Sequence, residues 1–475
     1  MRTYHQFRAL LIFSLLFFNV ALGADESTAS PMEMAEQEAL YSAIQGFVGK
    51  SWNGSELYPD PCGWTPIQGV SCDLFDGTWY VTVLSIGPVL ENSLECAWDA
   101  EFTPHLFDLR HLKSLSIFDC FPHHRQRQHP AAVPSQSWEK LAGSLETLEF
   151  RSNRGLGGGV PPGIGRLTSL QSLVMVENGL TGELPQELGN LVRLKRLVLS
   201  GNQFFGQVPA SLGYSMDELL ILDLSRNSLT GPLPASLGGL SSLLKLDLSN
   251  NLLDGQLPSE LGKLRNLTLL DLRNNRLSGG VGSSLHGMAS LQEMLLSNNP
   301  LGGNLTYFPW EKMENLTTVD LSNTGLAGNI PESMAALTDL RFLALDNNHL
   351  LGEVPAELAA LPMVGALYLN GNNLTGQLGF SEGFYRRMGR RFAAWGNPDL
   401  CYSAAEEGAG LAPVGVEQCK QEQGGPAPSS AVRNGVGGGS PPDQGTTLPA
   451  STSGFSATPV GGFPSVVLLV VVLLL

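Results

Sequence analysis

The residues of this chain that could perform chemistry are few, and their spacing argues against catalysis and metal binding. Six Cys are present, but no two of them lie two to four residues apart, as a structural zinc site requires. Only two of the eight His, His286 and His349, fall in the repetitive part of the chain, without a nucleophile elbow or a phosphate-binding loop. The sequence therefore predicts no catalytic residues, no metal and no cofactor, and a function based on binding.

One further cluster, in the segment 121–130, combines three His with two Arg. A metal site made of His123, His124 and His129 is conceivable. A loop with Pro near both ends would not hold such ligands in a preorganised geometry, so a solvated basic loop is the expected structure. Its positive charge would suit an anionic wall polysaccharide or an acidic partner, and the sequence leaves open whether it binds either.

Composition restricts the class of protein. Charged residues make up only 15% of the 475 residues, whereas Gly contributes 55 and Pro 30. Such a chain is too apolar to be disordered and too rich in Gly and Pro for a helical bundle. The net charge of -16 argues against nucleic acid as a partner, because binding to phosphate backbones depends on a basic surface.

The first residues have the features of a secretory signal peptide, residues 1–23. Arg2 and Arg8 precede an apolar run over residues 9–22, and Ala21 and Gly23 supply small residues for a cut after Gly23. A run of fourteen residues is too short to cross about 30 Å of hydrocarbon. We therefore expect the chain to be exported through the ER.

The last residues predict a lipid anchor. Residues 421–453 are rich in Gly, Pro, Ser and Thr and read as a flexible stalk, and the anchor signal would occupy 454–475. Ser451 has small neighbours, a spacer follows it, and the final ten residues are aliphatic, as in a GPI-anchor signal. Residues 456–458 offer a second attachment site. The expected location is the outer face of the plasma membrane, with the apoplast or cell wall as the alternative.

Between these ends one pattern recurs ten times, with apolar residues at positions 1, 4 and 6 and Asn at position 9. The coils begin at intervals from Leu145 to Val364, which gives a period of about 24 residues. Position 9 is Thr324 in one coil. In the other nine it is Asn153, Asn178, Asn202, Asn227, Asn251, Asn275, Asn299, Asn348 and Asn372.

The spacing has a physical meaning. Positions 4 and 6 lie two apart and point to the same side of a short strand, whereas positions 3, 5 and 7 point to the other side. A single coil cannot bury its apolar face, so the coils must stack into one continuous core. An Asn at the following turn would be buried, and its amide must bond to backbone groups of its own coil and the neighbouring coil.

The same residues resemble those of plant extracellular leucine-rich-repeat proteins. In six coils a Gly, two residues later an aliphatic residue, and then Pro follow the Asn, as in Gly182-Glu-Leu-Pro185 and Gly352-Glu-Val-Pro355. The resemblance implies an α/β solenoid, a right-handed horseshoe of plant-type repeats with a parallel concave sheet and disulfide-stapled caps. Pro is missing in the coils at 279–282, 303–306 and 376–379, so their convex-side strands are in doubt.

The cysteines and the early coils narrow the resemblance. The long first coils, the run Asp60-Pro-Cys-Gly-Trp64 and the run Phe384-Tyr-Arg-Arg-Met388 are most similar to the Piriformospora indica-insensitive type of plant receptor-like protein. The resemblance implies an N-terminal cap with Cys62 paired to Cys72 and a C-terminal cap with Cys401 paired to Cys419. Cys96 and Cys120 remain for each other.

The expected organisation is a signal peptide (1–23), an N-terminal cap (24–80), the repeat solenoid (81–379), a C-terminal cap (380–420), the stalk and the anchor signal. Sequons predict glycosylation at Asn53, Asn266, Asn304, Asn315 and Asn373.

Candidate binding residues lie at the concave positions 3, 5, 7 and 8. Asp recurs at position 5 and would form an acidic stripe, which four Arg interrupt, and two aromatic residues lie in the late coils. We expect a basic patch over the early coils and an aromatic patch over the late ones. The predicted residues are Arg151, Arg196, Arg226, Arg273, Asp223, Asp247, Asp271, Asp320, Asp346, Phe342 and Tyr368.

The resemblance implies a cell-surface receptor-like or co-receptor protein without a kinase domain, active in root responses to microbes or in growth. It would bind an extracellular peptide, glycan or protein and act through a transmembrane receptor kinase. The alternatives are an inhibitor of a microbial wall-degrading enzyme such as a polygalacturonase, and a structural role in wall adhesion. The ligand, the kinase and the oligomeric state do not follow from the sequence.

Overall fold

The computed structural model describes residues 32–420 except 89–92, 123–130, 283–284 and 404–411. These residues belong to one compact unit, Met1–Lys420, and Gln421–Leu475 form a second unit. The predicted signal peptide, the His123/His124/His129 loop, the stalk and the anchor residue Ser451 lie outside the described residues. Within the described ranges, no helix is long and apolar enough to cross a membrane.

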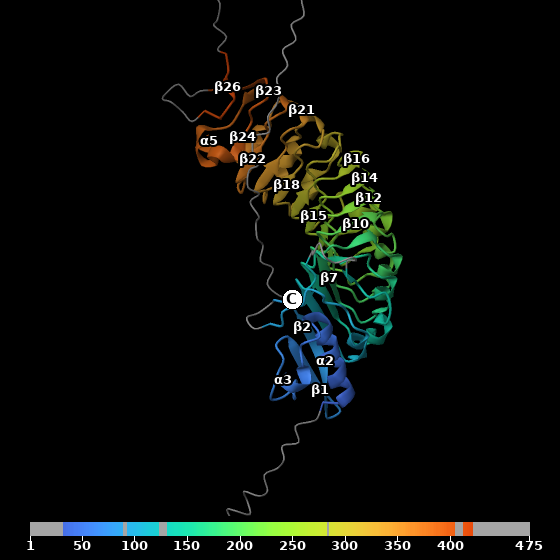
Figure 1. The fold of residues 1–475 in the computed structure, drawn as a ribbon. Helices are drawn as coiled ribbons and strands as arrows, with labels where there is room; N and C mark the ends of the chain where they lie inside the picture. Colours follow the sequence, from blue (N-terminus) through green and yellow to red (C-terminus); the bar gives the residue numbers. More distant parts are fainter. Residues whose placement is uncertain (1–31, 89–92, 123–130, 283–284, 404–411, 421–475) are drawn as a thin grey trace, which may run out of the picture. The chain divides into compact units, whose positions relative to one another are not determined.

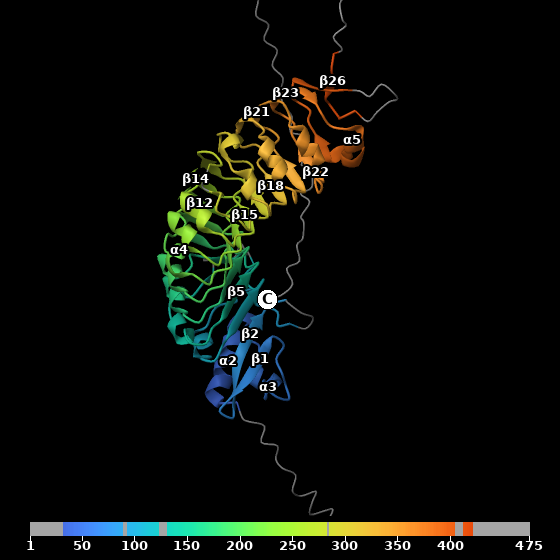
Figure 2. The same cartoon turned by 180° about the vertical axis from the view of Figure 1, so that it is seen from behind.

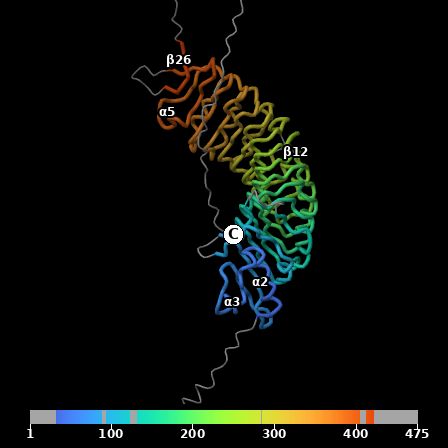
Figure 3. Tube along the Cα trace, viewed as in Figure 1, coloured from blue at the N-terminus to red at the C-terminus, as the bar shows by residue number. Residues whose placement is uncertain are grey.

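The unit is a stack of coils whose strands form one long sheet on the inner side of the curve (Figure 1). The sheet has 14 strands; only the first pair is antiparallel, and the others follow one another in parallel along the chain. Figure 3 shows the coils succeeding one another in sequence order. The strands are β1 (Val70–Phe75), β2 (Thr78–Ile86), β3 (Ser114–Phe118), β5 (Thr147–Arg151), β7 (Ser172–Val176), β9 (Arg196–Val198), β11 (Ile221–Asp223), β13 (Lys245–Asp247), β15 (Leu269–Asp271), β17 (Glu293–Leu295), β18 (Thr318–Asp320), β20 (Phe342–Ala344), β22 (Ala366–Tyr368) and β24 (Phe392–Ala393).

The register of this sheet follows the repeat. Leu222, Leu246 and Leu270, all at position 4, pair across neighbouring strands and are fully buried. Because each position lies opposite its equivalent in the next coil, the inward-facing Leu residues form one continuous core. The predicted solenoid with a parallel sheet is confirmed.

The outer side of the stack carries shorter elements, seen from behind in Figure 2. One five-stranded sheet comprises β8 (Thr181–Glu183), β10 (Gln203–Gly206), β12 (Ser228–Pro232), β14 (Leu252–Gln256) and β16 (Arg276–Ser278). A second comprises β19 (Ala327–Asn329), β21 (His349–Gly352), β23 (Asn373–Leu378), β25 (Asp399–Tyr402) and β26 (Glu417–Gln418). Between them the coil that lacks Pro at 303–306 contributes only an isolated bridge from Asn304 to Ala327. For the other two coils that lack this Pro, with 279–282 and 376–379, the doubt was wrong, because β16 and β23 form in them.

The turns that lead back to the long sheet are mostly 3₁₀-helices rather than α-helices. Several begin directly after the Pro of the repeat, whose fixed φ suits the start of a helical turn. In the early coils, β4 (Ala131–Ala132) pairs with β6 (Leu156–Gly157) in a small two-stranded parallel sheet. The 3₁₀-helices include η2 (Trp138–Leu141), η3 (Pro162–Arg166), η4 (Gln186–Asn190), η5 (Ala235–Gly239), η6 (Ser259–Lys263), η10 (Glu332–Ala336) and η11 (Ala356–Ala360), and one α-helix, α4 (Leu212–Ser215), takes the same place.

The Asn side chains at position 9 bond the coils to one another. Asn251 donates from Nδ2 to the carbonyl oxygens of Leu224 in the preceding coil and Leu248 in its own, both at 3.0 Å. Its Oδ1 accepts the backbone N–H of Leu229 at 3.0 Å. Equivalent bonds recur along the stack, and all of these Asn except Asn227 are buried. Each amide therefore satisfies backbone groups that the core hides from water.

The coil that contains Thr324 and the last coil depart from the pattern. The side chain of Thr324 donates from Oγ1 to the carbonyl of Leu321 at 2.7 Å and to Oδ1 of Asn348 in the next coil at 3.0 Å. The N–H of Leu301 in the preceding coil, which would meet an Asn, bonds instead to the carbonyl of Asn299. Asn397 occupies position 9 of an eleventh coil that the sequence analysis missed. It donates to Leu369 and Ala394 and accepts from the N–H of Leu374.

Both ends of the stack are covered. The helix α2 (Met34–Val48) buries Leu40, Ile44 and Phe47 against the first coils, and α3 (Gly54–Leu57) follows it. At the other end, α5 (Glu382–Met388) packs its aromatic side chains against Phe380 and Phe392. The disulfides join Cys62 to Cys72, Cys96 to Cys120 and Cys401 to Cys419.

Candidate functional site

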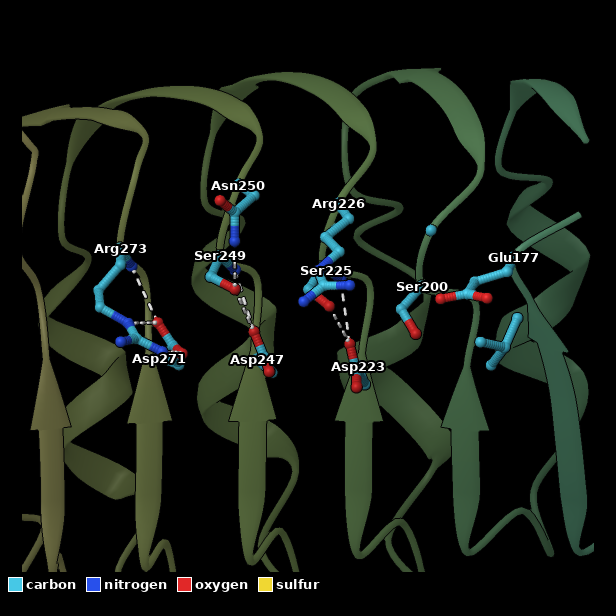
Figure 4. A pocket seen from close by; sticks show the side chains of 12 residues that line it. Glu177, Ser200, Asp223, Ser225, Arg226, Asp247, Ser249, Asn250, Asp271 and Arg273 are labelled. Carbon is cyan, nitrogen blue, oxygen red and sulfur yellow. Dashed lines mark hydrogen bonds and ion pairs between the residues drawn. The ribbon is translucent and has the colours of Figure 1, made fainter. Parts of the chain in front are cut away.

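A shallow pocket of about 290 Å³ lies at the carboxyl ends of the middle strands of the long sheet. Figure 4 shows its side chains in a row beyond the ends of their strands, with one set contributed by each coil. Because the repeat returns every position to the same face, residues about 24 apart in sequence become neighbours. The pocket is lined by Val176, Glu177, Ser200, Gly201, Asp223, Ser225, Arg226, Asp247, Ser249, Asn250, Asp271 and Arg273.

Three carboxylates form the floor of this pocket. Asp223, Asp247 and Asp271 end consecutive strands and pair in register, so they stand one strand apart. Ser225 donates from its hydroxyl to Asp223, and Ser249 does the same to Asp247, both at 2.7 Å. Burial and the neighbouring charges of Asp223 and Asp271 raise the pKa of Asp247. A bound cation or hydrogen-bond donor would therefore stabilise the charged form of Asp247.

Cationic side chains partly balance these charges. Arg273 makes a bidentate contact with Asp271, at 3.0 and 2.6 Å, and this ion pair raises the pKa of Arg273. Lys245, which the sequence analysis did not single out, holds its Nζ 3.6 Å from Asp223 and 3.5 Å from Asp247. Arg226 stands at the rim above Ser225 (Figure 4). The site is thus a mixed-charge surface, suited to a polar ligand with both donors and acceptors.

A row of exposed amides borders the pocket, and the sequence analysis missed it too. Asn274 donates to Asn250, Asn298 to Asn274 and Asn323 to Asn298, at 2.8 to 3.0 Å. All four have positive φ, which Asn tolerates better than most residues. Asn stands at position 8 in five consecutive coils, of which Asn347 belongs to the last, and this was the signal that could have revealed the row.

The structure places the other predicted concave residues in two further groups. In the early coils, Arg151 forms an ion pair with Glu149 of its own strand, whereas Arg196 is exposed at the start of β9. The charge of Arg151 is therefore locally balanced. These two residues lie outside the pocket that contains Arg226 and Arg273.

In the late coils, Phe342 and Tyr368 stand with ring centroids 5.7 Å apart. Asp320 accepts from Ser297 and Ser322, and burial together with the charge of Asp320 raises the pKa of Asp346. Asp320 is separated from Asp271 by Leu295, so the acidic row is interrupted after its third member.

The five sequons lie away from the concave positions, and each of their Asn side chains is exposed. Within the described ranges no group of three or more His, Cys, Asp or Glu residues could hold a metal ion.

Comparison with known proteins identifies the family of the repeat region. Residues 144–392 match the model of the leucine-rich repeat region family. The chain is similar to Piriformospora indica-insensitive protein 2 of Arabidopsis thaliana, with 55% identity over 180 residues, which are 36% of this chain and 40% of that protein. The matched part thus spans less than half of that relative.

Two solved structures share the architecture. The plant peptide hormone receptor RGFR1 in complex with RGF2 has a TM-score of 0.52 and 25% identity, and the match covers 64% of this chain and 50% of that chain. The Arabidopsis receptor kinase HAESA in complex with the peptide hormone IDA and the co-receptor SERK1 has a TM-score of 0.50 and 25% identity, over 78% of this chain and 70% of that one. With more than half of its residues matched by the family model, and with the stacked parallel sheet and its Asn bonds, the chain belongs to the leucine-rich repeat family.

Proposed function

We propose that this protein is a cell-surface receptor-like binding protein that captures an extended peptide on its concave sheet and acts through a partner receptor kinase. The observation that carries the proposal is the pocket at the ends of β11, β13 and β15, which is lined by three carboxylates together with Arg226 and Arg273. A surface built from five consecutive coils suits a chain-like ligand that runs across the strands.

The structural neighbours support a peptide over the other ligand classes. RGFR1 and HAESA were each solved with a peptide ligand, and the HAESA complex also contains a co-receptor. The pocket offers preorganised acceptors and donors, because Ser225, Ser249 and Arg273 fix the carboxylates in place. A peptide backbone presents the matching N–H and C=O groups.

The test is capture of ligands from root extracts by the immobilised protein and by two variants. Asp223→Asn with Asp247→Asn should lower the amount of captured peptide at least tenfold, since two charged acceptors are lost while shape is kept. Asp254→Asn, an exposed acid of the outer strand β14, is the matched control and should behave as the unchanged protein. Mass spectrometry of the eluted material measures the effect.

Three outcomes would replace the proposal. Equal capture by the pocket variant and the control would remove the concave pocket as the site. If the triple variant Phe342→Ala, Asp346→Ala and Tyr368→Ala alone lost capture, the aromatic patch of the late coils would be the site instead. Inhibition of a pectin-cleaving enzyme by the purified protein would favour the inhibitor function.

We also propose that the protein is exported and held at the outer face of the plasma membrane by a lipid attached near Ser451. The proposal rests on the sequence of the two ends, which lie outside the described residues. Enzymatic cleavage of glycolipid anchors on intact cells should release the protein into the medium. Retention on the cells after complete cleavage of a known anchored protein would contradict it.

A further inference from the structure

A second cavity, of about 310 Å³, lies beside the 3₁₀-helix η6 and the turn that follows it, and shares no residue with the concave pocket. It is lined by residues of two consecutive coils: Ser259, Gly262, Lys263, Arg265, His286 and Gly287. Three of these six can carry positive charge and none is acidic. In a chain with a net charge of -16, such a lining is an exception.

The lining comes from two neighbouring coils in which a Gly and a cationic residue stand in opposite order. Gly262-Lys263 follows the buried Leu261, and the equivalent pair after the buried Leu285 is His286-Gly287, in reversed order. Each coil therefore brings a cationic side chain where its neighbour has none. Gly287 is required by the close approach of the coils, because a Cβ at this position would collide with the carbonyl oxygen of Gly262.

Arg265 adds a third positive group beside the turn. The residues at its place in the neighbouring coils are Ser241 and Ala289, which are small and leave its guanidinium room to reach the cavity. Neither Lys263 nor Arg265 forms an ion pair with any described residue. Glu260, the acid of η6, accepts a hydrogen bond from Ser259 at 3.2 Å and is not part of the lining.

We propose that this cavity binds an oxyanion, the carboxylate, sulfate or phosphate group of a small ligand, at a site separate from the concave pocket. The guanidinium of Arg265 can bind two oxygens of such a group side by side, and Lys263 supplies a second positive charge in the same lining. The volume is at the lower end of the range for small-molecule sites. A ligand held there contacts two adjacent coils at once and stabilises their stacking.

The proposal is tested by calorimetric titration of the full-length protein with sodium sulfate, sodium phosphate and sodium galacturonate. Each titration is compared with sodium chloride at the same ionic strength, because salt screens exposed charges. We expect saturable binding of at least one of the three. The variant Lys263→Ala with Arg265→Ala should weaken that binding at least tenfold, with an unchanged melting temperature in the absence of the anion.

A matched control separates the site from general electrostatic attraction. Arg166→Ala with Arg193→Ala also removes two positive charges, but from exposed positions of earlier coils. This variant should leave the binding unchanged. Binding of galacturonate alone would identify a sugar acid as the source of the group, whereas binding of sulfate or phosphate would identify a tetrahedral anion. No saturable binding of any of the three, or an equal loss in the control, would overturn the proposal.

Discussion

Replacement of Asn251 by Ala should destabilise the protein by about 3 kcal/mol. The carbonyl oxygens of Leu224 and Leu248 would each keep one partner, because Asn227 also donates to Leu224 and Asn275 also donates to Leu248. The N–H of Leu229 would keep none of the bonds found here, since Oδ1 of Asn251 is its acceptor. A buried N–H without an acceptor, added to the lost bonds between coils, accounts for the expected size. Urea denaturation followed by circular dichroism measures it.

The neighbouring residue provides the control. Asn250 is exposed and has a φ of 57°, so Asn250→Gly keeps the backbone conformation while it removes the side chain. Its bonds, to Ser249 and from Asn274, lie at the rim where water can replace them. We expect a loss of less than about 1 kcal/mol. Equal losses for the two variants would show that the buried amides do not hold the coils together.

Much of the fold could be predicted because one rule repeats. The apolar residues at positions 4 and 6 and the Asn at position 9 determine which face is buried and where each coil turns. A parallel stack is the arrangement that buries every coil's apolar face, so the pattern predicts the sheet and its register together. The 3₁₀-helices were not predicted, because the segments after each Pro are too short for a helical period to show.

The last coil could not be found by the same rule. Its position 1 is Gly389, its position 6 is Ala394, and only Phe392 and Asn397 keep their roles. The C-terminal cap supplies the missing apolar contacts, since Phe380 and Phe384 pack against Phe392. This coil is therefore stabilised by packing against the C-terminal cap, and its own sequence does not show the repeat pattern.

The candidate site, too, could be predicted from the sequence only in part. Position 5 placed Asp223, Asp247 and Asp271 on one face, but how their charges are balanced depends on side-chain reach. Lys245 reaches two carboxylates because its long side chain starts from the same strand as Asp247, two residues away. Spacing alone does not say which of several nearby cations will pair with which acid.

The second large effect is a pH dependence that originates in the N-terminal cap. Glu36 of α2 is buried against β2, where its Oε1 accepts the N–H of Val81 at 3.1 Å. Burial, together with the charge of Glu33, raises its pKa to about 7, against an opposing effect of the Val81 bond. The folded protein therefore holds a proton on Glu36 between about pH 4.5 and pH 7, where the unfolded chain has released it.

Because the folded state binds more protons in this window, stability must fall as the pH rises from 4.5 to 7 and level off above it. The expected loss from this group is on the order of 2 kcal/mol. Glu36→Gln keeps the shape and removes the charge, so the variant should match the unchanged protein near pH 4 and exceed its stability by that amount at pH 8. Glu38→Gln, an exposed acid of the same helix, is the control and should follow the unchanged protein at every pH. A constant difference between Glu36→Gln and the unchanged protein across the range would mean that the pKa of Glu36 is the same in the folded and unfolded states, and would contradict the prediction.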